Sequence, residues 1–234
     1  MNEWQVKKFW TEVSIQPVAR GYAVRLDGRA IRTPAKAELI LPTEKFALYV
    51  ASEWEAQVEK IDPDNMPATR SANAAIDKVA IQKTEVADML AAYGDSDLLC
   101  YRATSPVELV ARQCEIWNPF LDWAAESLGV RLIPREGVVH HPQDPDDIAR
   151  LSKLVHALSN FELAAFHDLV SLSGSLILGF AVTQKVAPAE EIWLASRLDE
   201  NWQEQHWGED ADAVSLTAQK RSAFVDAAKI YDAS

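Results

Sequence analysis

Two adjacent histidines, His140 and His141, precede three aspartates and form the most metal-like cluster of the sequence: Asp144, Asp146 and Asp147. Imidazole and carboxylate groups ligate divalent ions, and a metal-bound water can serve as the nucleophile of hydrolysis. Adjacent histidines tend to point in different directions, however, and the aspartates also suit the start of a helix, where the helix dipole favours negative charge. A metal-dependent or acid/base hydrolase built on this cluster is the alternative hypothesis for function.

Other catalytic patterns are weaker. His167 and Asp168 could form an acid/base pair, but no Ser or Cys nucleophile stands in an elbow motif, and a core histidine explains the pair as well. The eight glycines form neither GxGxxG nor GxxxxGK[ST], so we expect no standard phosphate loop. Cys100 and Cys114 lack zinc-ligand spacing and are consistent with a reducing compartment. We therefore expect no cofactor and no metal.

Segment 192–212 combines acidic residues with tryptophans. On a helix, Glu200, Gln203 and Trp207 fall at spacings of three and four and share a face, whereas Asp199 lies on an adjacent face. An exposed aromatic supplies area that is desolvated on binding, and a carboxylate supplies orientation. The segment therefore predicts a protein-binding surface; a solvated helix whose tryptophans pack inward is the alternative.

The composition is that of a globular protein with a buried core: 234 residues, 48% hydrophobic and 25% charged. A formal net charge of -12 argues against nucleic acid or an anionic membrane as the main partner, because both attract basic surfaces. Residues 1–50 nevertheless carry eight Lys and Arg against five Asp and Glu, while 186–212 carry eight acids against Arg197 alone. These poles could orient a partner, or they could be ordinary solvated faces.

Residues 6–59 are predicted to form strands followed by one helix. Residues 6–41 alternate β-branched and aromatic residues with turn signals, and Asp27-Gly28 between two alternating segments predicts a hairpin. Thr43 then caps a predicted helix over 44–59, whose apolar residues repeat every four positions. The Pro- and Asp-rich loop 61–67 is the predicted domain boundary. No signal core or transit pattern occurs in MNEWQVKKFW, so we expect a cytoplasmic protein.

The remainder is predicted to be helical around residues 161–182, the longest nearly uncharged run. This run is shorter than the about 20 predominantly apolar residues of a membrane span, so no membrane insertion is expected. Ser159 and Glu162 form a capping box at its start. Further helices are predicted over 68–93, 105–128, 188–207 and 212–231 and from 144 onward, with an extended pair at 130–133 and 138–141 and an undecided run at 97–101.

The predicted fold class is α+β. A small N-terminal antiparallel β-rich domain with a helix occupies residues 1–66, and an all-α helical domain around a buried central helix occupies 67–234.

Seven stretches together resemble one known family, the assembly chaperones of F-type ATP synthase that handle the alpha subunit of its catalytic head. The stretches are FW at 9–10, GYAVRLDGRAIRTPAKAELILPT at 21–43, ASEWEAQ at 51–57, MPATRSANAAID at 66–77, DLLCYRA at 97–103, RQCEIWNPFLDWA at 112–124 and RLDENWQEQHWG at 197–208. The resemblance covers nearly the whole chain.

The resemblance implies a protein with no enzyme activity and no cofactor that binds the unassembled alpha subunit and prevents its aggregation before it pairs with beta. Carried over to this sequence, it makes Glu200 the important carboxylate, with Asp199, Gln203 and Trp207 around it and Glu162 as a further candidate. We expect the protein to act as a monomer.

Overall fold

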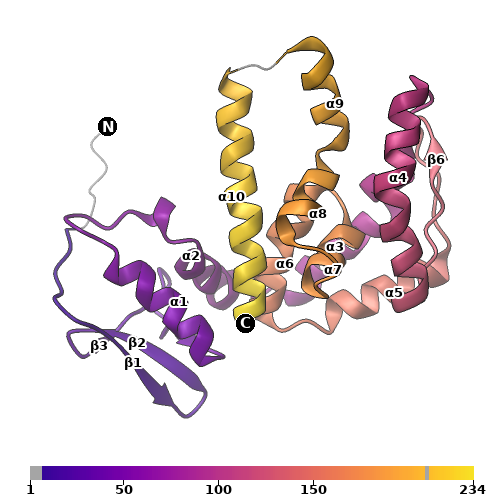
Figure 1. The fold of residues 1–234 in the computed structure, drawn as a ribbon. Coiled ribbons are helices and arrows are strands. Elements are labelled where there is room, and N and C mark those ends of the chain that lie inside the picture. The colour runs from indigo at the N-terminus through magenta and orange to yellow at the C-terminus, as the bar shows by residue number, and fades with distance from the viewer. Residues whose placement is uncertain (1–6, 209–210) are drawn as a thin grey trace. The chain divides into compact units, whose positions relative to one another are not determined.

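The computed structural model describes residues 7–208 and 211–234. For residues 211–213 it describes the backbone but not the surroundings of the side chains. The chain begins with a small antiparallel sheet and continues in helices, so the α+β class is confirmed (Figure 1). The residues cluster into two compact units. The first comprises the chain up to Lys83 with Ser159–Ala165 and Lys229–Ser234, and the second comprises Thr84–Leu158 and Phe166–Ala228.

The sheet of the first unit is organised around β2. Strands β1 (Val13–Val18), β3 (Arg29–Ala30) and β4 (Ile40–Leu41) all pair antiparallel with β2 (Gly21–Leu26). Asp27 and Gly28 adopt positive φ angles of 47° and 78°, as a tight two-residue hairpin requires. The predicted hairpin is therefore confirmed.

Helix α1 (Glu44–Glu55) packs against the sheet, and buried Val24, Leu41, Phe46 and Val50 form the core between them. Thr43 caps the helix by accepting a hydrogen bond from the Phe46 amide at 3.1 Å. The prediction that the helix continues to 59 is wrong. The chain leaves the helix at Ala56, and so Val58 is 80% exposed instead of continuing the buried stripe.

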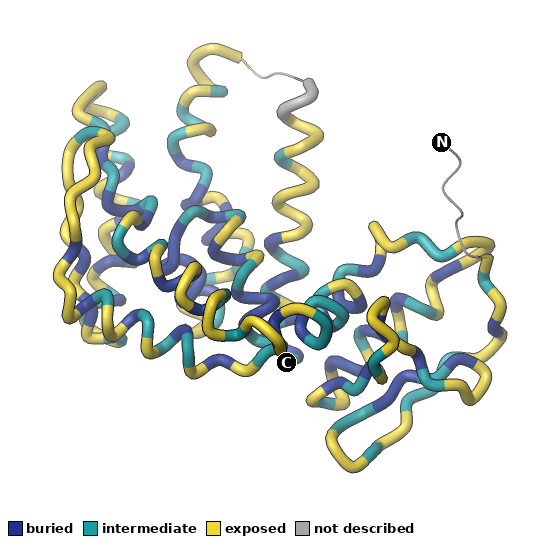
Figure 2. The backbone as a smooth tube through the Cα atoms, turned by 180° about the vertical axis from the view of Figure 1, so that it is seen from behind, coloured by how far each residue is buried: buried dark blue, intermediate teal, exposed yellow. Residues whose placement is uncertain are grey.

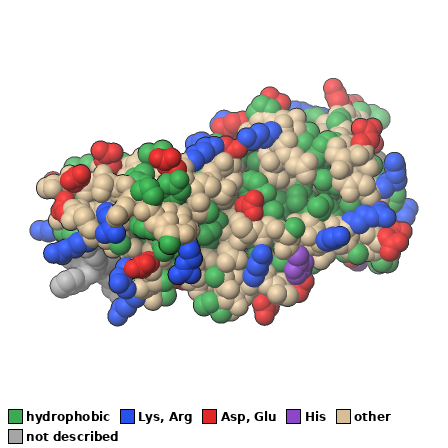
Figure 3. All heavy atoms as spheres, turned by 90° about the horizontal axis from the view of Figure 1, so that it is seen from below, with side chains coloured by type: hydrophobic (Ala, Val, Ile, Leu, Met, Phe, Trp, Pro, Cys, Tyr) green, Lys and Arg blue, Asp and Glu red, His purple; other side chains and the backbone are tan. Residues whose placement is uncertain are grey.

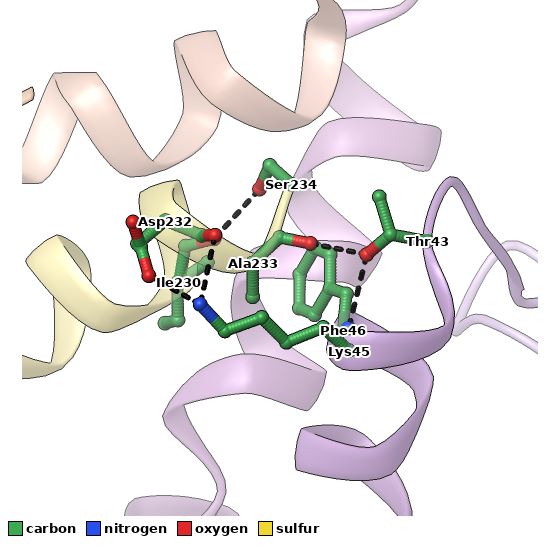
Figure 4. Close-up of polar contacts among 7 residues, drawn as sticks. All are labelled: Thr43, Lys45, Phe46, Ile230, Asp232, Ala233 and Ser234. Atoms are coloured by element: carbon green, nitrogen blue, oxygen red, sulfur yellow. Dashed lines mark hydrogen bonds and ion pairs between the residues drawn. The ribbon is translucent and has the colours of Figure 1, made fainter.

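The C-terminal residues complete the first unit (Figure 4). The Thr43 hydroxyl donates to the Ala233 carbonyl, and the Lys45 ammonium pairs with the Asp232 carboxylate. Phe46 also meets Phe161 edge-on, with ring centroids 5.9 Å apart. Two segments far along the chain thus contribute to the core of a unit that begins at the N-terminus.

Helix α2 (Pro67–Ala74) is capped by a carboxylate from α1. Glu53, 6% exposed, accepts hydrogen bonds from the Ala68 amide at 2.6 Å and from the Thr69 amide at 2.8 Å. Burial raises the pKa of Glu53, while these donors oppose the shift. Two of the stretches that resemble the chaperone family, EWEAQ and MPATR, are therefore joined by a structural cap.

The predicted helix over 68–93 is divided. A π-helical turn at Ala75–Val79 follows α2, and α3 (Lys83–Ala91) starts after a short break. The undecided run 97–101 forms a 3₁₀ turn at Leu98–Cys100 that leads into β5 (Tyr101–Arg102).

The second unit is helical. The extended pair predicted at 130–133 and 138–141 is wrong, because β5 instead pairs in parallel with β6 (Arg135–Glu136). The helix predicted from 105 begins at Val107, and no side chain caps it. The helices of this unit that follow α3 are α4 (Val107–Trp123, continued by a π turn at Ala124–Leu128), α5 (Pro145–His156), α6 (Asn160–Ser173), α7 (Leu176–Thr183), α8 (Ala189–Ser196), α9 (Leu198–Trp207) and α10 (Ala211–Ala233). Of these, α6 begins in the first unit and α10 ends in it.

The single helix expected over 161–182 is two helices, α6 and α7. Gly174 turns the chain with a φ of 70°, and Ser175 caps α7 by accepting from the Leu178 amide at 3.0 Å. Residues 176–182 are all buried, so the expectation of an enclosed apolar segment holds. Within the described residues, no helix is both long and apolar enough to cross a membrane.

The domain division predicted at residue 66 stays a prediction. The two compact units are defined by which residues lie close together in space. Whether residues 1–66 and 67–234 fold independently is a separate property, which limited proteolysis would test.

Candidate protein-binding site

Helix α9 is set off from α8 by a local break at Arg197, whose φ of -102° and ψ of 16° leave the helical region. The predicted helix over 188–207 is therefore two helices. Gly208 ends α9 with a φ of 89°, directly after the helix end predicted at 207. On one side α9 packs against α4 (Figure 1). The break thus gives α9 its own direction and leaves α4 as its support.

Asp199 is directed to α4 and joins a buried polar chain. Its Oδ1 accepts a hydrogen bond from Gln113 Nε2 at 2.7 Å, and Gln113 Oε1 accepts from the Ala103 amide at 2.9 Å. Gln113 is only 1% exposed. Arg112 adds a second link by donating to Gln205 Oε1 at 3.2 Å. Asp199 therefore anchors α9 to its support.

Arg102 lies near this chain and is 8% exposed. Its Nε donates to the Leu99 carbonyl at 2.8 Å, and its guanidinium carbon lies 5.2 Å from the centroid of the Trp117 ring. Burial lowers the pKa of Arg102, while Cys114, Cys100 and Asp199 act in the opposite direction. Trp117 Nε1 in turn donates to the Ala195 carbonyl at 2.8 Å. The sequence analysis did not predict roles for Arg102 and Gln113. Arg102 directly follows the apolar run 97–101 and Gln113 lies within the predicted helix over 105–128, and a charged or polar residue at such a position was an available signal.

Glu200, Gln203 and Trp207, for which the helical spacing predicts a shared face, are all exposed on α9. Glu200 Oε1 accepts from Arg197 Nη1 at 2.8 Å, and its side chain is still 47% exposed. Arg197 Nη2 also lies 3.6 Å from Glu204 Oε1. Trp207 is 79% exposed, so the alternative in which every tryptophan of this segment packs inward is wrong.

Further apolar side chains are exposed near the start of α10. Val214 is 46% exposed and Leu216 is 52% exposed. Figure 2 shows that the end of α9 and the part of α10 that follows residue 213 consist largely of exposed positions. The end of α9 and the beginning of α10 together therefore offer an indole, aliphatic groups and carboxylates to a partner.

Glu162 belongs to the first unit and closes the predicted capping box. Its Oε2 accepts from the Ser159 amide at 2.7 Å, and its own amide donates to Ser159 Oγ at 3.2 Å. This cap accounts for Glu162 at the start of α6, and its role in partner binding stays a prediction.

The residues of the hydrolase hypothesis are engaged separately. His140 lies 3.2 Å from Asp95 and 3.3 Å from the Tyr101 hydroxyl, whereas Asp144 caps α5 through the Asp146 amide at 2.8 Å. Asp147 pairs with Arg150 at 3.0 Å. Across the described ranges, 7–208 and 211–234, no group of three or more His, Cys, Asp or Glu could hold a metal ion.

His167 and Asp168 form a surface pair at 3.0 Å, so the interpretation of His167 as a core histidine is wrong. Both side chains are more than two-fifths exposed.

An exposed aromatic and acidic helix on a helical body is typical of proteins that act by binding other proteins. The family described as ATP12 chaperone protein matches residues 7–125, about half of the sequence. This chain belongs to the ATP12 chaperone family, whose members are non-enzymatic assembly factors of the ATP synthase F1 head. The hydrolase alternative has no support.

Relatives from several organisms are similar over most of their length. The mitochondrial protein atp12 of Schizosaccharomyces pombe is 26% identical over 222 residues, covering 90% of this chain and 76% of that protein. The crystal structure of Atp12 from Paracoccus denitrificans is 46% identical, with a TM-score of 0.95 and 99% of each chain covered. The Atu1473 protein of Agrobacterium tumefaciens is 39% identical, with a TM-score of 0.92, covering 97% of this chain and 85% of that one.

Proposed function

We propose that this chain holds the unassembled alpha subunit of the ATP synthase catalytic head, without using ATP, until the beta subunit replaces it. The observation that carries the proposal is Trp207, an indole left 79% exposed on the face of α9 that also bears Glu200 and Gln203. Free subunits of an oligomer expose apolar surface and aggregate unless it is covered. The resemblance of seven sequence stretches to chaperones of the alpha subunit supports the choice of partner.

The α9 residues have different proposed roles. Trp207 is the anchor, because buried tryptophans contribute much of the binding energy of interfaces. Glu200 and Gln203 orient the partner through charge and hydrogen bonds. Asp199 acts indirectly, since its contact with Gln113 holds α9 on α4. Glu162 is retained as a partner residue only as a secondary proposal, because its carboxylate already serves the cap.

Charge supports an oriented approach. Among the described residues, Arg197 is the one cation within ion-pair distance of both Glu200 and Glu204, and its side chain is 17% exposed. Excess negative potential on this face would attract a basic rim on the partner and raise the association rate. A beta subunit that forms a larger interface with the alpha subunit would then displace the chaperone without any chemical step.

The test measures binding of purified alpha subunit to the chain and its variants by calorimetry. Trp207→Ala is expected to weaken binding about 30-fold, in the range of a typical hot-spot residue. Glu200→Gln removes the charge but keeps the side-chain shape, and Glu200→Lys reverses it. We expect a graded loss of affinity in that order, with a smaller salt dependence for both variants.

Matched controls come from the same unit. Glu85→Lys reverses an exposed charge on α3, and Leu194→Ala removes an apolar side chain that is 57% exposed on α8. Both should bind as the unaltered chain does, and circular dichroism should show all variants folded. Unaltered binding by folded Trp207→Ala and Glu200→Lys would refute the assignment of the surface, whereas no binding by the unaltered chain would refute the choice of partner.

We further propose that the protein works in the cytoplasm as a monomer. Both cysteines are free, Cys100 buried and Cys114 exposed, which is consistent with a reducing compartment. Cell fractionation and sedimentation equilibrium test the two statements; recovery outside the cytoplasm, or a stable dimer, contradicts them.

A further inference from the structure

The first unit carries an exposed surface that the proposed function does not use. Lys7 and Lys60 face each other across an isolated antiparallel bridge, and the Lys8 amide donates to the Glu59 carbonyl at 3.0 Å. Phe9 lies two positions after Lys7 and Val58 lies two positions before Lys60, so each lysine has an exposed apolar residue close to it in the chain. We call Lys7, Phe9, Val58 and Lys60 the lysine–apolar patch.

All four side chains of the lysine–apolar patch are exposed, and the two apolar ones strongly so. Phe9 is 65% exposed and Val58 is 80% exposed. Figure 3 shows several Lys and Arg side chains gathered on the part of the surface that belongs to the first unit. The patch thus combines positive charge with apolar area, although the whole chain has a formal net charge of -12.

The two lysines form an unfavourable arrangement in the free protein. Like charges directly opposite each other on neighbouring strands are destabilising. In the part of the chain that the structure describes, neither ammonium lies within ion-pair distance of a carboxylate. A negatively charged group placed over both lysines would remove this repulsion as well as add its own attraction.

The patch rests on a firm base. Lys8 and Trp10 occupy the alternate positions of the same segment, and the Lys8 ammonium lies 5.6 Å from the centroid of the Trp10 ring while donating to the Gln57 carbonyl at 2.7 Å. Trp10 is 4% exposed and packs edge-on against Trp54, with centroids 5.2 Å apart. A buried base of this kind lets the exposed residues bind without much ordering cost.

We propose that the lysine–apolar patch docks an acidic segment of a partner protein that carries a large apolar residue next to its carboxylates. Carboxylates would lie over Lys7 and Lys60, and the apolar side chain would cover Phe9 and Val58. Charge complementarity selects this occupant over a basic segment, and exposed Phe9 and Val58 favour an apolar side chain beside the carboxylates.

The test uses the full chain and a fluorescein-labelled synthetic peptide in which Asp alternates with Phe. Fluorescence anisotropy at low ionic strength should show saturable binding that weakens as salt is added. Two comparison peptides, one with Lys in place of Asp and one with Ala in place of Phe, should bind at least about fivefold more weakly, since each removes one of the two contributions.

The variant Lys60→Glu separates docking from a structural role. It replaces a repulsive cross-strand pair with an attractive one, so the thermal midpoint of the chain should rise while the affinity for the Asp–Phe peptide falls about fivefold. Lys78→Glu reverses another exposed lysine of the first unit and should leave the affinity unchanged. Phe9→Ser should lower the affinity through loss of the apolar contact.

Several outcomes overturn the proposal. These are equal binding of the basic and acidic peptides, unchanged affinity of folded Lys60→Glu and Phe9→Ser, and a loss of affinity that merely follows a lowered thermal midpoint. Binding to phosphatidylserine vesicles in preference to the peptide would point to a membrane instead. Self-association abolished by Lys60→Glu would make a second copy of the chain the occupant.

Discussion

Asp97 is a buried carboxylate whose substitution should make the stability of the chain less dependent on pH. It is 0% exposed. Although distant in sequence, it contacts the first residues of α7, whose residues 176–182 are all buried. Its oxygens accept hydrogen bonds from Ser175 Oγ at 2.7 Å, from the Ile177 amide at 3.0 Å and from the Leu99 amide at 3.0 Å. Burial raises its pKa from 3.8 to about 6, although these donors oppose the rise.

The sign of the effect follows from which state holds the proton. Between pH 3.8 and about 6 the folded chain keeps Asp97 protonated while the unfolded chain releases the proton, so the free energy of unfolding falls as pH rises. Each pKa unit corresponds to about 1.4 kcal/mol, so the total loss is about 3 kcal/mol. Nearly half of this loss falls between about pH 5 and about pH 7.5, an accessible range.

The variant Asp97→Asn isolates this contribution. An amide cannot accept hydrogen bonds on both sides, so the variant should be less stable than the unaltered chain by a roughly constant amount of about 1 to 3 kcal/mol. In addition to this constant difference, the stability advantage of the unaltered chain should shrink by about 1 to 2 kcal/mol when the pH is raised from about 5 to about 7.5.

The assay is urea unfolding at a series of pH values, followed by circular dichroism and tryptophan fluorescence. Asp122→Asn, at an exposed position of α4, is the control. It shows how far the free energy of unfolding changes when a surface carboxylate is lost. A difference between Asp97→Asn and the unaltered chain that stays constant with pH would refute the reasoning. A difference that grows with pH would show that the hydrogen bonds and the α7 terminus outweigh burial.

Two further predictions concern local geometry and are checked by thermal denaturation. Gly21→Ala should destabilise the chain by about 2 kcal/mol or more, because Gly21 has a φ of 140° and an added Cβ would lie 2.1 Å from the Leu41 carbonyl oxygen; an unchanged midpoint would contradict this. Ser159→Ala removes the Ser159 hydroxyl of the capping box at the start of α6 and should cost about 1 kcal/mol, and a loss below about 0.3 kcal/mol would show that Glu162 caps the helix alone.

The features that could be predicted from sequence are those set by neighbours along the chain. The Asp27-Gly28 hairpin, the caps at Thr43 and Ser159 and the end of α9 at Gly208 depend on conformational preferences of a few adjacent residues. Composition likewise predicted the burial of residues 176–182. Such signals need no knowledge of what packs against them.

Helix breaks were predicted less well, because distant residues decide them. The apolar run 161–182 gives no strong stop signal apart from Gly174, and it is Asp97, far away in the sequence, that completes the cap of α7 through Ser175 and Ile177. The first unit also gains its C-terminal residues through Thr43 and Lys45, whose partners at Ala233 and Asp232 leave no local pattern.

The same limit applies to the candidate binding site. Helical spacing predicts a shared face for Glu200, Gln203 and Trp207 and leaves open whether these residues are exposed, as they are in the structure. It cannot reveal that Asp199 is held by Gln113 from α4, or that Arg102 lies beside the same cluster. Three of the stretches that resemble the chaperone family, 97–103, 112–124 and 197–208, meet in that polar cluster.

This convergence explains how an exposed tryptophan can be kept in place. Helix α9 buries only Leu198 among its own residues, so apolar packing alone gives it little reason to stay on the body. The hydrogen bonds from Gln113 to Asp199 and from Arg112 to Gln205 supply that attachment while leaving the face with Trp207 free. A partner-binding helix of this kind can expose a large apolar group, because the residues that hold it are polar and lie outside the face that bears Trp207.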